Sequence, residues 1–472
     1  MTDSWASSSA FGADLHLELH GPGLRQGLMD ALREAVRTGR LAPGTRLPSS
    51  RSFAADLGIA RNTVADAYAE LVAEGWLTAR QGSGTRVAQR SAPREPAAGT
   101  VGARPPRGRP TYSLMPGSPD LASFPRTEWL KAARRALSAA PHEAFGYGDP
   151  RGRVELRTVL ADYLARARGV YAAPERIVIC SGFVHGLMLT GKVLRQRRVR
   201  DVAVESYGLD VHWNLLADAG LRTSALPFDE LGTDTAPLGR GELRGVGAVL
   251  MTPAHQFPIG VPLHPDRRAA AVDWARTTGG VILEDDYDGE FRYDRQPVGA
   301  LQGLEPEHVV YLGTASKSLA PGLRLAWMVL PQAMVGEVLE AKGGVDWVSS
   351  ALDQLTLAEF IASGAYDRHV RRMRLRYRRR RDELVQQLAE HAPGIRVSGI
   401  AAGLHAVLEL PPGTEQSALR AAAWQGLGVE PVSRFRHEDA PADRDALVVG
   451  YATPPDSAWD GALEALCRAL GE

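Results

Sequence analysis

Cysteine is scarce in this sequence: Cys180 and Cys467 are the only two among 472 residues. Because they show no paired spacing, they argue against a disulfide framework and a structural zinc site, and we expect no metal. A run of about eighteen apolar residues is also missing, so we expect no membrane-spanning helix and no membrane partner. The first residues, MTDSWASSSAFGADLHLELH, do not resemble a secretory signal. These absences predict a protein of the reducing cytoplasm.

The chain has no net charge, because 55 basic residues balance 55 acidic ones. This balance neither supports nor excludes a nucleic-acid partner, since binding depends on where charges cluster. The glycine pattern of dinucleotide-binding loops is absent too, which disfavours a nucleotide cofactor. What is present is 44% hydrophobic and 23% charged residues, as in a globular protein with a large core.

One stretch, Gln89 to Pro110, differs in composition from the rest of the chain. It holds five prolines, three glycines and five arginines, with Val101 as its only large aliphatic residue. Such a stretch buries too little apolar surface to fold, so we predict a linker. The sequence then predicts five segments: a tail (1–14), a small domain (15–88), the linker (89–112), a large subdomain (113–352) and a smaller C-terminal subdomain (353–472).

The small domain has the pattern of three helices followed by a hairpin. The first helix, which should stop at Gly39, is indicated by apolar residues at helical spacing: Leu24, Leu28, Leu32 and Val36. PSSRSFAADLG predicts a short helix with a serine cap at Ser49 or Ser50 and a turn at Gly58. RNTVADAYAELVAEG predicts the third helix, and WLTARQGSGTRVA two strands around a tight turn. This order predicts a winged helix-turn-helix DNA-binding domain.

A recognition helix needs apolar residues on one side and polar side chains near its N-terminus. Val64, Tyr68 and Leu71 would face inward, while the DNA contacts would come from the first turn, the preceding helix and the wing. The candidate DNA-binding residues are Arg51 for a phosphate, Arg61, Asn62 and Thr63 for base edges and phosphates, and Gly82, Gly84, Thr85 and Arg86 in the wing. Taken one at a time, any of these arginines could be an ordinary solvated charge.

After the linker, short apolar runs alternate with helical segments. This alternation predicts an α/β domain with a largely parallel sheet and helices on both faces, and the runs are RIVICSG, DVAVES, GAVLMTP, GVILEDD, VVYLGTA and LAWMVLP. From about Asp353 the pattern is helical, and GLHAVLEL and ALVVGYA then predict strands of a smaller α+β subdomain.

Several segments of this domain suit one cofactor, pyridoxal 5'-phosphate. Lys317 lies between apolar strands, and a lysine amine can form a Schiff base with an aldehyde. VILEDDYDGEF ends a buried strand in acids, one of which could pair with a protonated pyridine nitrogen. His255 and Gln256 follow another strand, where open α/β sheets bind ligands. CSGFVHG offers a strand-to-helix turn whose backbone amides suit an anion.

The motifs LPSSR and RNTV and the glycine-rich wing resemble the GntR-type winged helix over residues 15–88, with Ala60 where that family more often has a serine cap. Residues 113–472 resemble fold-type-I aminotransferases, and the whole chain resembles the MocR subfamily of GntR-type regulators. The resemblance implies a Schiff-base lysine at Lys317, Asp285 at the pyridine nitrogen, and Tyr287 beside His255 at the phenolic oxygen. It further implies a homodimer in which Tyr147 reaches the partner's site, and a phosphate cup of Ser181, Gly182, Phe183, Thr314, Ser316 and Arg324.

Two positions depart from the aminotransferase pattern. VESYGLD lacks the usual proline and glycine before the ring-stacking aromatic, and Tyr207 is our candidate for that ring. Val448 stands near the position of the arginine that grips a substrate carboxylate; Arg434 or Arg436 could replace it. Loss of this clamp predicts weak or no transaminase turnover.

The leading hypothesis is a pyridoxal-phosphate-responsive regulator that binds double-stranded operator DNA and controls vitamin B6 synthesis or amine and amino-acid metabolism. Its effector would be pyridoxal phosphate alone or together with an amine or amino acid. The alternative is an active pyridoxal-phosphate-dependent aminotransferase with a fused DNA-binding domain. A cofactor-free binding module is a third hypothesis, which Lys317, Asp285 and Tyr287 disfavour.

A run of eight arginines lies between Arg371 and Asp382 within one predicted helix. We interpret it as a charged helix that connects the two subdomains. The alternative is a second surface that contacts DNA phosphates.

Overall fold

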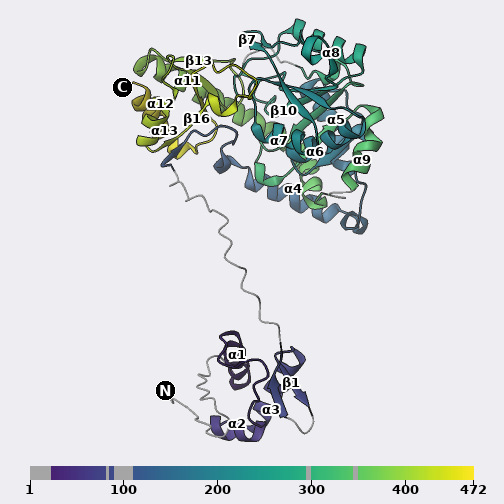
Figure 1. Cartoon of the computed structure of the whole chain (residues 1–472), viewed down its shortest axis with the longest axis vertical. Coiled ribbons are helices and arrows are strands. Elements are labelled where there is room, and N and C mark those ends of the chain that lie inside the picture. The colour runs from purple at the N-terminus through teal and green to yellow at the C-terminus, as the bar shows by residue number, and fades with distance from the viewer. Residues whose placement is uncertain (1–22, 81–83, 90–109, 294–298, 344–348, 472) are drawn as a thin grey trace. The chain divides into compact units, whose positions relative to one another are not determined.

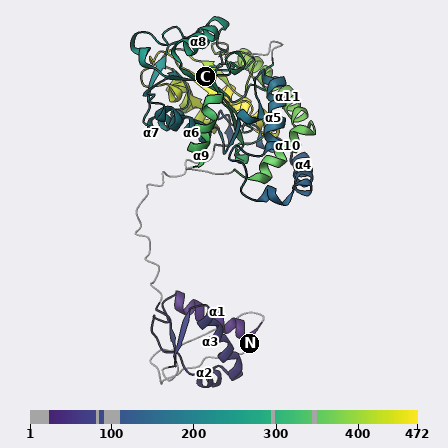
Figure 2. The ribbon, with the colours of Figure 1, turned by 90° about the vertical axis from the view of Figure 1, so that its right-hand side faces the viewer.

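The computed structural model describes residues 23–80, 84–89, 110–293, 299–343 and 349–471. The chain forms two compact units, Met1–Arg107 and Gly108–Glu472 (Figures 1 and 2). The predicted tail (1–14), Gly82 of the wing and most of the predicted linker lie outside the described residues, and the five predicted segment boundaries stay a prediction. Within the described ranges, no helix is long and apolar enough to cross a membrane.

The N-terminal unit is the predicted winged helix-turn-helix. Its elements are α1 (Leu24–Arg37), α2 (Ser50–Leu57), α3 (Arg61–Ala73), β1 (Leu77–Arg80) and β2 (Gly84–Val87), and the two strands pair antiparallel. Ser49 caps α2 by accepting a hydrogen bond from the Ser52 amide, and Gly58 ends the helix in the left-handed conformation at φ 65°. Helix α3 begins without a side-chain cap, since Ala60 stands at that position. The apolar stripe of α1 begins at Leu28 rather than Leu24, because Leu24 is 56% exposed at the open end of the helix.

The larger unit is built on a seven-stranded sheet with the order β4-β12-β11-β10-β9-β5-β6. Six strands are the predicted apolar runs: β4 (Ile177–Cys180), β5 (Asp201–Glu205), β9 (Ala248–Met251), β10 (Val281–Asp286), β11 (Val309–Thr314) and β12 (Ala326–Val329). The seventh, β6 (Arg222–Leu226), is an edge strand that the sequence did not predict. Strand β12 runs antiparallel to both of its neighbours, and the other adjacent strands pair parallel.

Helices cover both faces of this sheet, as predicted. One face packs against α6 (Phe183–Gln196), α7 (Asp210–Asp218) and α9 (Val335–Gly343). The other packs against α4 (Arg126–Ala139), α5 (Val154–Arg168), α8 (Pro265–Thr278) and α10 (Ala351–Ala362). Successive side chains of a strand alternate between the faces: in β10, Leu283 joins the α6 cluster and Ile282 the α8 cluster. The same alternation turns Asp285 toward the first face and Asp286 toward the second.

The C-terminal part is the predicted α+β subdomain (yellow-green and yellow in Figure 1). It contains α11 (Ala365–His391), β13 (Arg396–Ser398), β14 (Ala406–Glu409), α12 (Glu415–Trp424), β15 (Leu427–Gly428), β16 (Glu430–Pro431), β17 (Ala446–Val449) and α13 (Asp456–Leu470). Four strands form an antiparallel sheet in the order β13-β14-β17-β16. Strand β3 (Tyr112–Ser113) pairs with β15, so the beginning of the larger unit lies against the C-terminal subdomain. A small hairpin of β7 (Phe228–Asp229) and β8 (Gly232–Thr233) completes the strands of the described residues.

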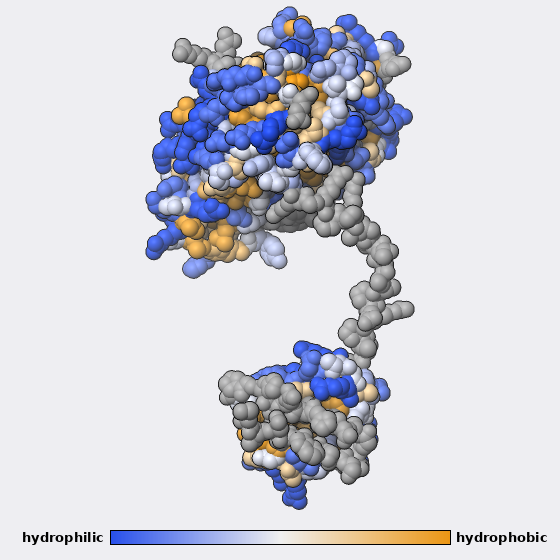
Figure 3. Space-filling view, turned by 90° about the vertical axis from the view of Figure 1, so that its left-hand side faces the viewer, coloured by the Kyte–Doolittle hydropathy of each residue, from blue (hydrophilic) through white to orange (hydrophobic). Residues whose placement is uncertain are grey.

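Apolar side chains fill the interior of each unit. On the faces seen in Figure 3, hydrophilic residues dominate and apolar residues gather in smaller patches between them. The N-terminal unit has its own core, in which Val64, Tyr68 and Leu71 are buried as predicted. Because that core is complete within the unit, α3 does not need the larger unit to bury its apolar face.

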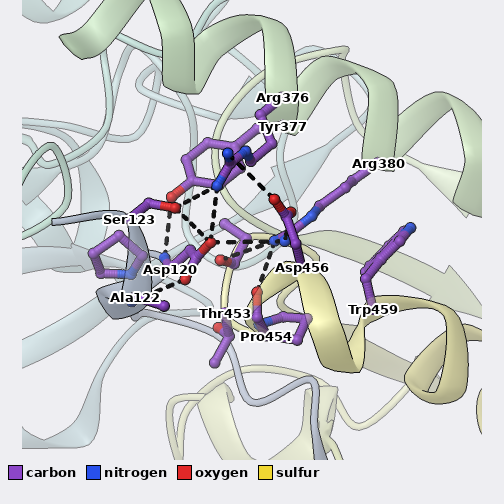
Figure 4. A network of polar contacts seen from close by, with 12 residues as sticks. Asp120, Ala122, Ser123, Arg376, Tyr377, Arg380, Thr453, Pro454, Asp456 and Trp459 are labelled. Atoms are coloured by element: carbon purple, nitrogen blue, oxygen red, sulfur yellow. Dashed lines mark hydrogen bonds and ion pairs between the residues drawn. The ribbon is translucent and has the colours of Figure 1, made fainter. Parts of the chain in front are cut away.

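The arginine run lies on α11, and its members differ in their surroundings. Arg380 is fully buried, pairs with Asp456 at 2.6 Å and donates to the Pro454 carbonyl at 2.8 Å (Figure 4). Arg376 pairs with Asp120 at 3.2 Å and also contacts Ser123. These contacts join α11 to the beginning of the larger unit and to the start of α13. Part of the run is therefore structural and does not face solvent.

Candidate functional site

A cavity of about 590 Å³ lies at the edge of the sheet where the parallel strands end. We call it the first cavity. Eight of the predicted cofactor residues line it: Phe183, Tyr207, Asp285, Tyr287, Thr314, Ser316, Lys317 and Arg324. They come together because the carboxyl ends of neighbouring parallel strands share one edge.

Lys317 follows β11 in a turn and points into the first cavity. Its Nζ donates a hydrogen bond to the Gly117 carbonyl, which comes from the beginning of the larger unit. Burial lowers the pKa of Lys317, while the negative charges of Asp285 and Asp288 act in the opposite direction. A lysine with a lowered pKa has more of its amine in the neutral, nucleophilic form.

Asp285 is buried at the end of β10 and lines the same cavity. Its Oδ1 has no hydrogen-bond partner among the described residues. Burial raises the pKa of Asp285 well above its ordinary value, and the Lys317 charge only partly opposes this. A buried acceptor without a partner is costly. A protonated pyridine nitrogen would satisfy this oxygen, so the residues present fit the ring of pyridoxal phosphate.

Tyr287 and His255 form a hydrogen-bonded group beside Asp285. The Tyr287 hydroxyl donates to the His255 carbonyl at 3.1 Å and lies 3.1 Å from His255 Nδ1. Asp288 Oδ2 lies 2.9 Å from the same nitrogen. Because Nδ1 can donate its proton to only one acceptor, the Asp288 carboxylate fixes the orientation of the imidazole.

The turn between β4 and α6 has the geometry of an anion site. Gly182, the N-cap of α6, has φ 102°, and a Cβ at this residue would lie 2.6 Å from the Arg324 guanidinium. Arg324 Nη2 donates to the Ser181 carbonyl at 2.6 Å. At the end of β11, Thr314 Oγ1 lies 2.8 Å from Ser316 Oγ. Backbone amides at a helix N-terminus, hydroxyl groups and a guanidinium together suit a phosphate.

Four of the twelve predicted cofactor residues are not in the lining of the first cavity: Tyr147, His255, Ser181 and Gly182. Tyr147 is 98% exposed and does not line it, so its predicted role needs a partner subunit. Tyr207 lines the cavity, and its carbonyl accepts a hydrogen bond from Gln256 Nε2 at 2.8 Å. Both roles stay predictions.

The two arginines considered for the carboxylate clamp have different positions. Val448 is fully buried in the core, as expected for a position without a polar role. Arg434 lines the first cavity and pairs with Asp210 at 2.8 Å. Arg436 does not line it and donates to the Ala440 carbonyl at 2.6 Å. Arg434 is therefore the one of the two that can reach a ligand there.

Sequence reasoning missed four ionisable residues that line this cavity: His212, His405, Glu205 and Glu430. Burial lowers the pKa of His212 and of His405 to about 4 and raises the pKa of Glu205 to about 7. The His212 ring lies 4.6 Å from that of Phe183. The position of His212, soon after the end of β5, could have indicated that it lines the cavity. His405, in contrast, reaches the cavity only through the tertiary fold.

The candidate DNA contacts form an exposed group on the N-terminal unit. Arg61 and Asn62 are exposed and Thr63 is half-buried in the first turn of α3, and Arg51 is exposed on α2. On the wing, the described residues Gly84, Thr85 and Arg86 form most of β2, and Gly84 has φ 79°. Arg86 also donates to the Gly44 carbonyl at 3.0 Å, which fixes the wing against the body of the unit.

Comparisons with known proteins agree with both units. Residues 24–87 match the family described as "Bacterial regulatory proteins, gntR family", and residues 116–464 match "Aminotransferase class I and II". The chain is 33% identical over 430 residues to the HTH-type pyridoxine biosynthesis transcriptional regulator PdxR of Corynebacterium glutamicum, covering 90% of this chain and 92% of that protein. It is 31% identical over 446 residues to the "Probable rhizopine catabolism regulatory protein MocR" of Rhizobium meliloti, covering 90% and 89%. The chain belongs to the MocR subfamily of GntR-type transcription regulators.

A solved structure agrees with this assignment at the level of the fold. An archaeal alanine:glyoxylate aminotransferase superposes on this MocR-type chain with a TM-score of 0.68 at 24% identity, covering 76% of this chain and 90% of that one. The larger unit of the regulator therefore has the fold-type-I aminotransferase fold, joined to a GntR helix-turn-helix domain.

Proposed function

We propose that this MocR-type protein binds pyridoxal phosphate in the first cavity and that the cofactor controls its binding to operator DNA. The observation on which the proposal rests most is the buried Asp285 Oδ1 without a partner, in one cavity with Lys317. The unsatisfied carboxylate oxygen can accept a hydrogen bond from the pyridine nitrogen of the cofactor. The nearby amine of lowered pKa can condense with its aldehyde. The cofactor supplies an aldehyde that condenses with a lysine amine and gives an absorbance band.

The residues around Lys317 would each hold one part of the cofactor. Asp285 would accept from the pyridine nitrogen, and the Tyr287 hydroxyl, oriented by His255, would donate to the phenolic oxygen. The start of α6, with Arg324 beside it, would bind the phosphate. Tyr207 and His212 are the candidates for contact with the ring face.

A homodimer is part of the proposal, because a fully exposed Tyr147 has no role in its own chain's cavity. The same region exposes further apolar side chains: Leu130 and Leu137 of α4 are 68% and 54% exposed, and Phe145 is 53% exposed. Burying such side chains against a second copy would stabilise a dimer. Analytical ultracentrifugation should show a dimer, and a monomer that retains full cofactor affinity would rule out a shared site.

The regulated genes would be those of vitamin B6 synthesis or of amine and amino-acid metabolism. A relative named as a pyridoxine biosynthesis regulator supports the first of these. The effector would be pyridoxal phosphate alone or with an amine or amino acid, and the protein would act in the cytoplasm, where it meets operator DNA.

The test has a spectroscopic step and a DNA-binding step. Purified protein with added pyridoxal phosphate should develop an absorbance band that Lys317→Ala abolishes. The control is Lys342→Ala, which removes a buried lysine that donates to the Ile179 carbonyl; when folded, this variant should keep the band. Operator affinity should then change with cofactor concentration in the wild type and not in Lys317→Ala. A colourless wild type, or equal responses in both proteins, would refute the proposal.

An active aminotransferase with a fused DNA-binding domain is the second candidate. It is favoured by Arg434, which lines the first cavity and could grip a carboxylate if Asp210 released it. It predicts product accumulation over many enzyme equivalents with some amino donor and 2-oxo acid. A spectral change limited to one turnover with every donor would exclude it.

A further inference from the structure

The larger unit has a second cavity, of about 470 Å³, that the proposed function does not use. Five arginines of the described residues line it: Arg166, Arg168, Arg292, Arg371 and Arg374. They come from three segments far apart in the sequence, namely the end of α5, the segment after β10 and the first half of α11. Their convergence on one hollow is a property of the tertiary fold.

Acidic residues balance part of this charge. Among the described residues, Asp367 is the only acid in the lining, and it pairs with Arg166 at 2.9 Å. Arg168 is buried and pairs with Asp286 at 2.6 Å, behind the cavity wall. Arg374 donates to a backbone carbonyl, that of Glu290, at 2.6 and 2.9 Å. Among the described residues, the lining of the second cavity therefore holds more basic than acidic side chains, with the buried carboxylates of Asp286 and Glu290 next to it.

Helix electrostatics explain a part of the cluster only. Basic residues are favoured in the last turn of a helix, and Arg166 and Arg168 lie in the last turn of α5. Arg371 and Arg374, by contrast, lie within the first half of α11, and Arg292 lies in a loop. Like charges in a hollow repel one another, so the arrangement is best satisfied by an anion from outside the chain.

We propose that the second cavity binds a small phosphorylated ligand. Guanidinium groups match phosphate oxygens in a bidentate way, and several of them on separate segments favour an anion with more than one charge. The cavity volume is in the range of small-molecule sites, roughly 300–1,000 Å³. Phosphates of a DNA backbone have the same chemistry, and they are the other source that the experiment must distinguish.

The experiment is isothermal titration of the full chain, with pyridoxal phosphate present, using inorganic pyrophosphate as the probe. We expect saturable binding that weakens at least tenfold in the double variant Arg166→Gln/Arg371→Gln. The matched control is Arg378→Gln/Arg379→Gln on the same helix, where the arginines pair with Asp382 and Glu383 outside the cavity. This control should bind like the wild type, and circular dichroism checks that both variants are folded.

Two further measurements determine which site binds the phosphate. If pyrophosphate binding is lost in Arg324→Gln but unchanged in the Arg166/Arg371 variant, the probe occupies the first cavity and the proposal is wrong. The salt dependence of binding to a DNA duplex is measured in parallel, because each lost phosphate contact lowers the slope of log K by about 0.9. A lower slope in the double variant with no pyrophosphate binding would assign the arginines to DNA and overturn the small ligand. Unchanged pyrophosphate binding with an unchanged slope would overturn the phosphate site altogether.

Discussion

Asp285 and Asp286 are neighbours on β10, yet their side chains lie on opposite faces of the sheet and have different surroundings. Asp286 accepts hydrogen bonds from Arg168 at 2.6 and 3.0 Å and from the Tyr311 hydroxyl at 2.8 Å. Asp285 Oδ1 has no partner among the described residues and faces the first cavity. Both carboxylates are buried, but both oxygens of Asp286 accept hydrogen bonds, whereas Oδ1 of Asp285 accepts none from the described residues. The difference separates a group that stabilises the fold from one that is free to bind a ligand.

Substitution of these two aspartates should give the largest contrast. Asp286→Asn would leave the Arg168 guanidinium buried without its paired charge and should lower the free energy of unfolding by about 3–5 kcal/mol. Asp285→Asn removes a buried carboxylate that lacks a partner and should leave the stability of the cofactor-free chain nearly unchanged or raise it. Urea unfolding followed by circular dichroism measures both. Equal losses in the two variants would show that Asp285 has a partner within the fold.

The same contrast between paired and solvated charge extends to α11. Arg380 is fully buried among Asp120, Asp456 and the Trp459 ring (Figure 4). Arg378, by contrast, is exposed and pairs with Asp382 at 3.8 Å. Arg380→Gln should cost about 2–4 kcal/mol, less than Asp286→Asn because Asp456 is half exposed and stays solvated. Arg378→Gln should change the free energy of unfolding by less than about 1 kcal/mol. Thermal unfolding of the two variants tests this, and similar melting temperatures would contradict it.

Much of the fold could be predicted from the sequence because its strands are buried on both faces. Six apolar runs such as RIVICSG and VVYLGTA are strands of the sheet, since burial on both faces demands apolar residues throughout. Strand β6, Arg222–Leu226, escaped prediction because four of its five residues are not buried, so its apolar pattern is weak. Strand β4, at the other edge of the sheet, is fully buried and has a clear apolar pattern.

The sequence indicates more of the residues that line the first cavity than of those that line the second. Its residues follow successive strands, and parallel strands bring such residues to one edge. His405 and Gly117 could not be placed this way, because they reach the cavity from the C-terminal subdomain and from the beginning of the larger unit. The second cavity depends on pairs such as Arg166 and Asp367, which are 201 residues apart, and no local pattern relates them.

Substitution of Gly182 should have a smaller effect, which is limited to ligand affinity in the first cavity. In Gly182→Ala the new Cβ would meet the Arg324 guanidinium at 2.6 Å, and alanine is strained at φ 102°. We expect about a tenfold loss of pyridoxal-phosphate affinity, measured by absorbance titration, with pyrophosphate binding in the second cavity unchanged. Gly336→Ala on α9, where the Cβ would meet nothing within 4 Å, is the control and should bind the cofactor like the wild type. Unaltered affinity in Gly182→Ala would show that Arg324 moves freely.

The smallest effect concerns the pH dependence of cofactor capture. Only the neutral amine of Lys317 attacks an aldehyde, so the rate of band formation should rise with pH through the pKa of Lys317. Because burial lowers this pKa, the rate should level off below pH 10.5, the ordinary value for lysine. The negative charge of Asp288 raises the pKa of Lys317, so Asp288→Asn should move the plateau to lower pH and speed capture on the rising limb by less than about tenfold. Stopped-flow absorbance across the pH range measures both profiles. A plateau at the same pH in both proteins would mean that solvent screens the Asp288 charge from the amine, which would place Lys317 in a more open site than the first cavity provides.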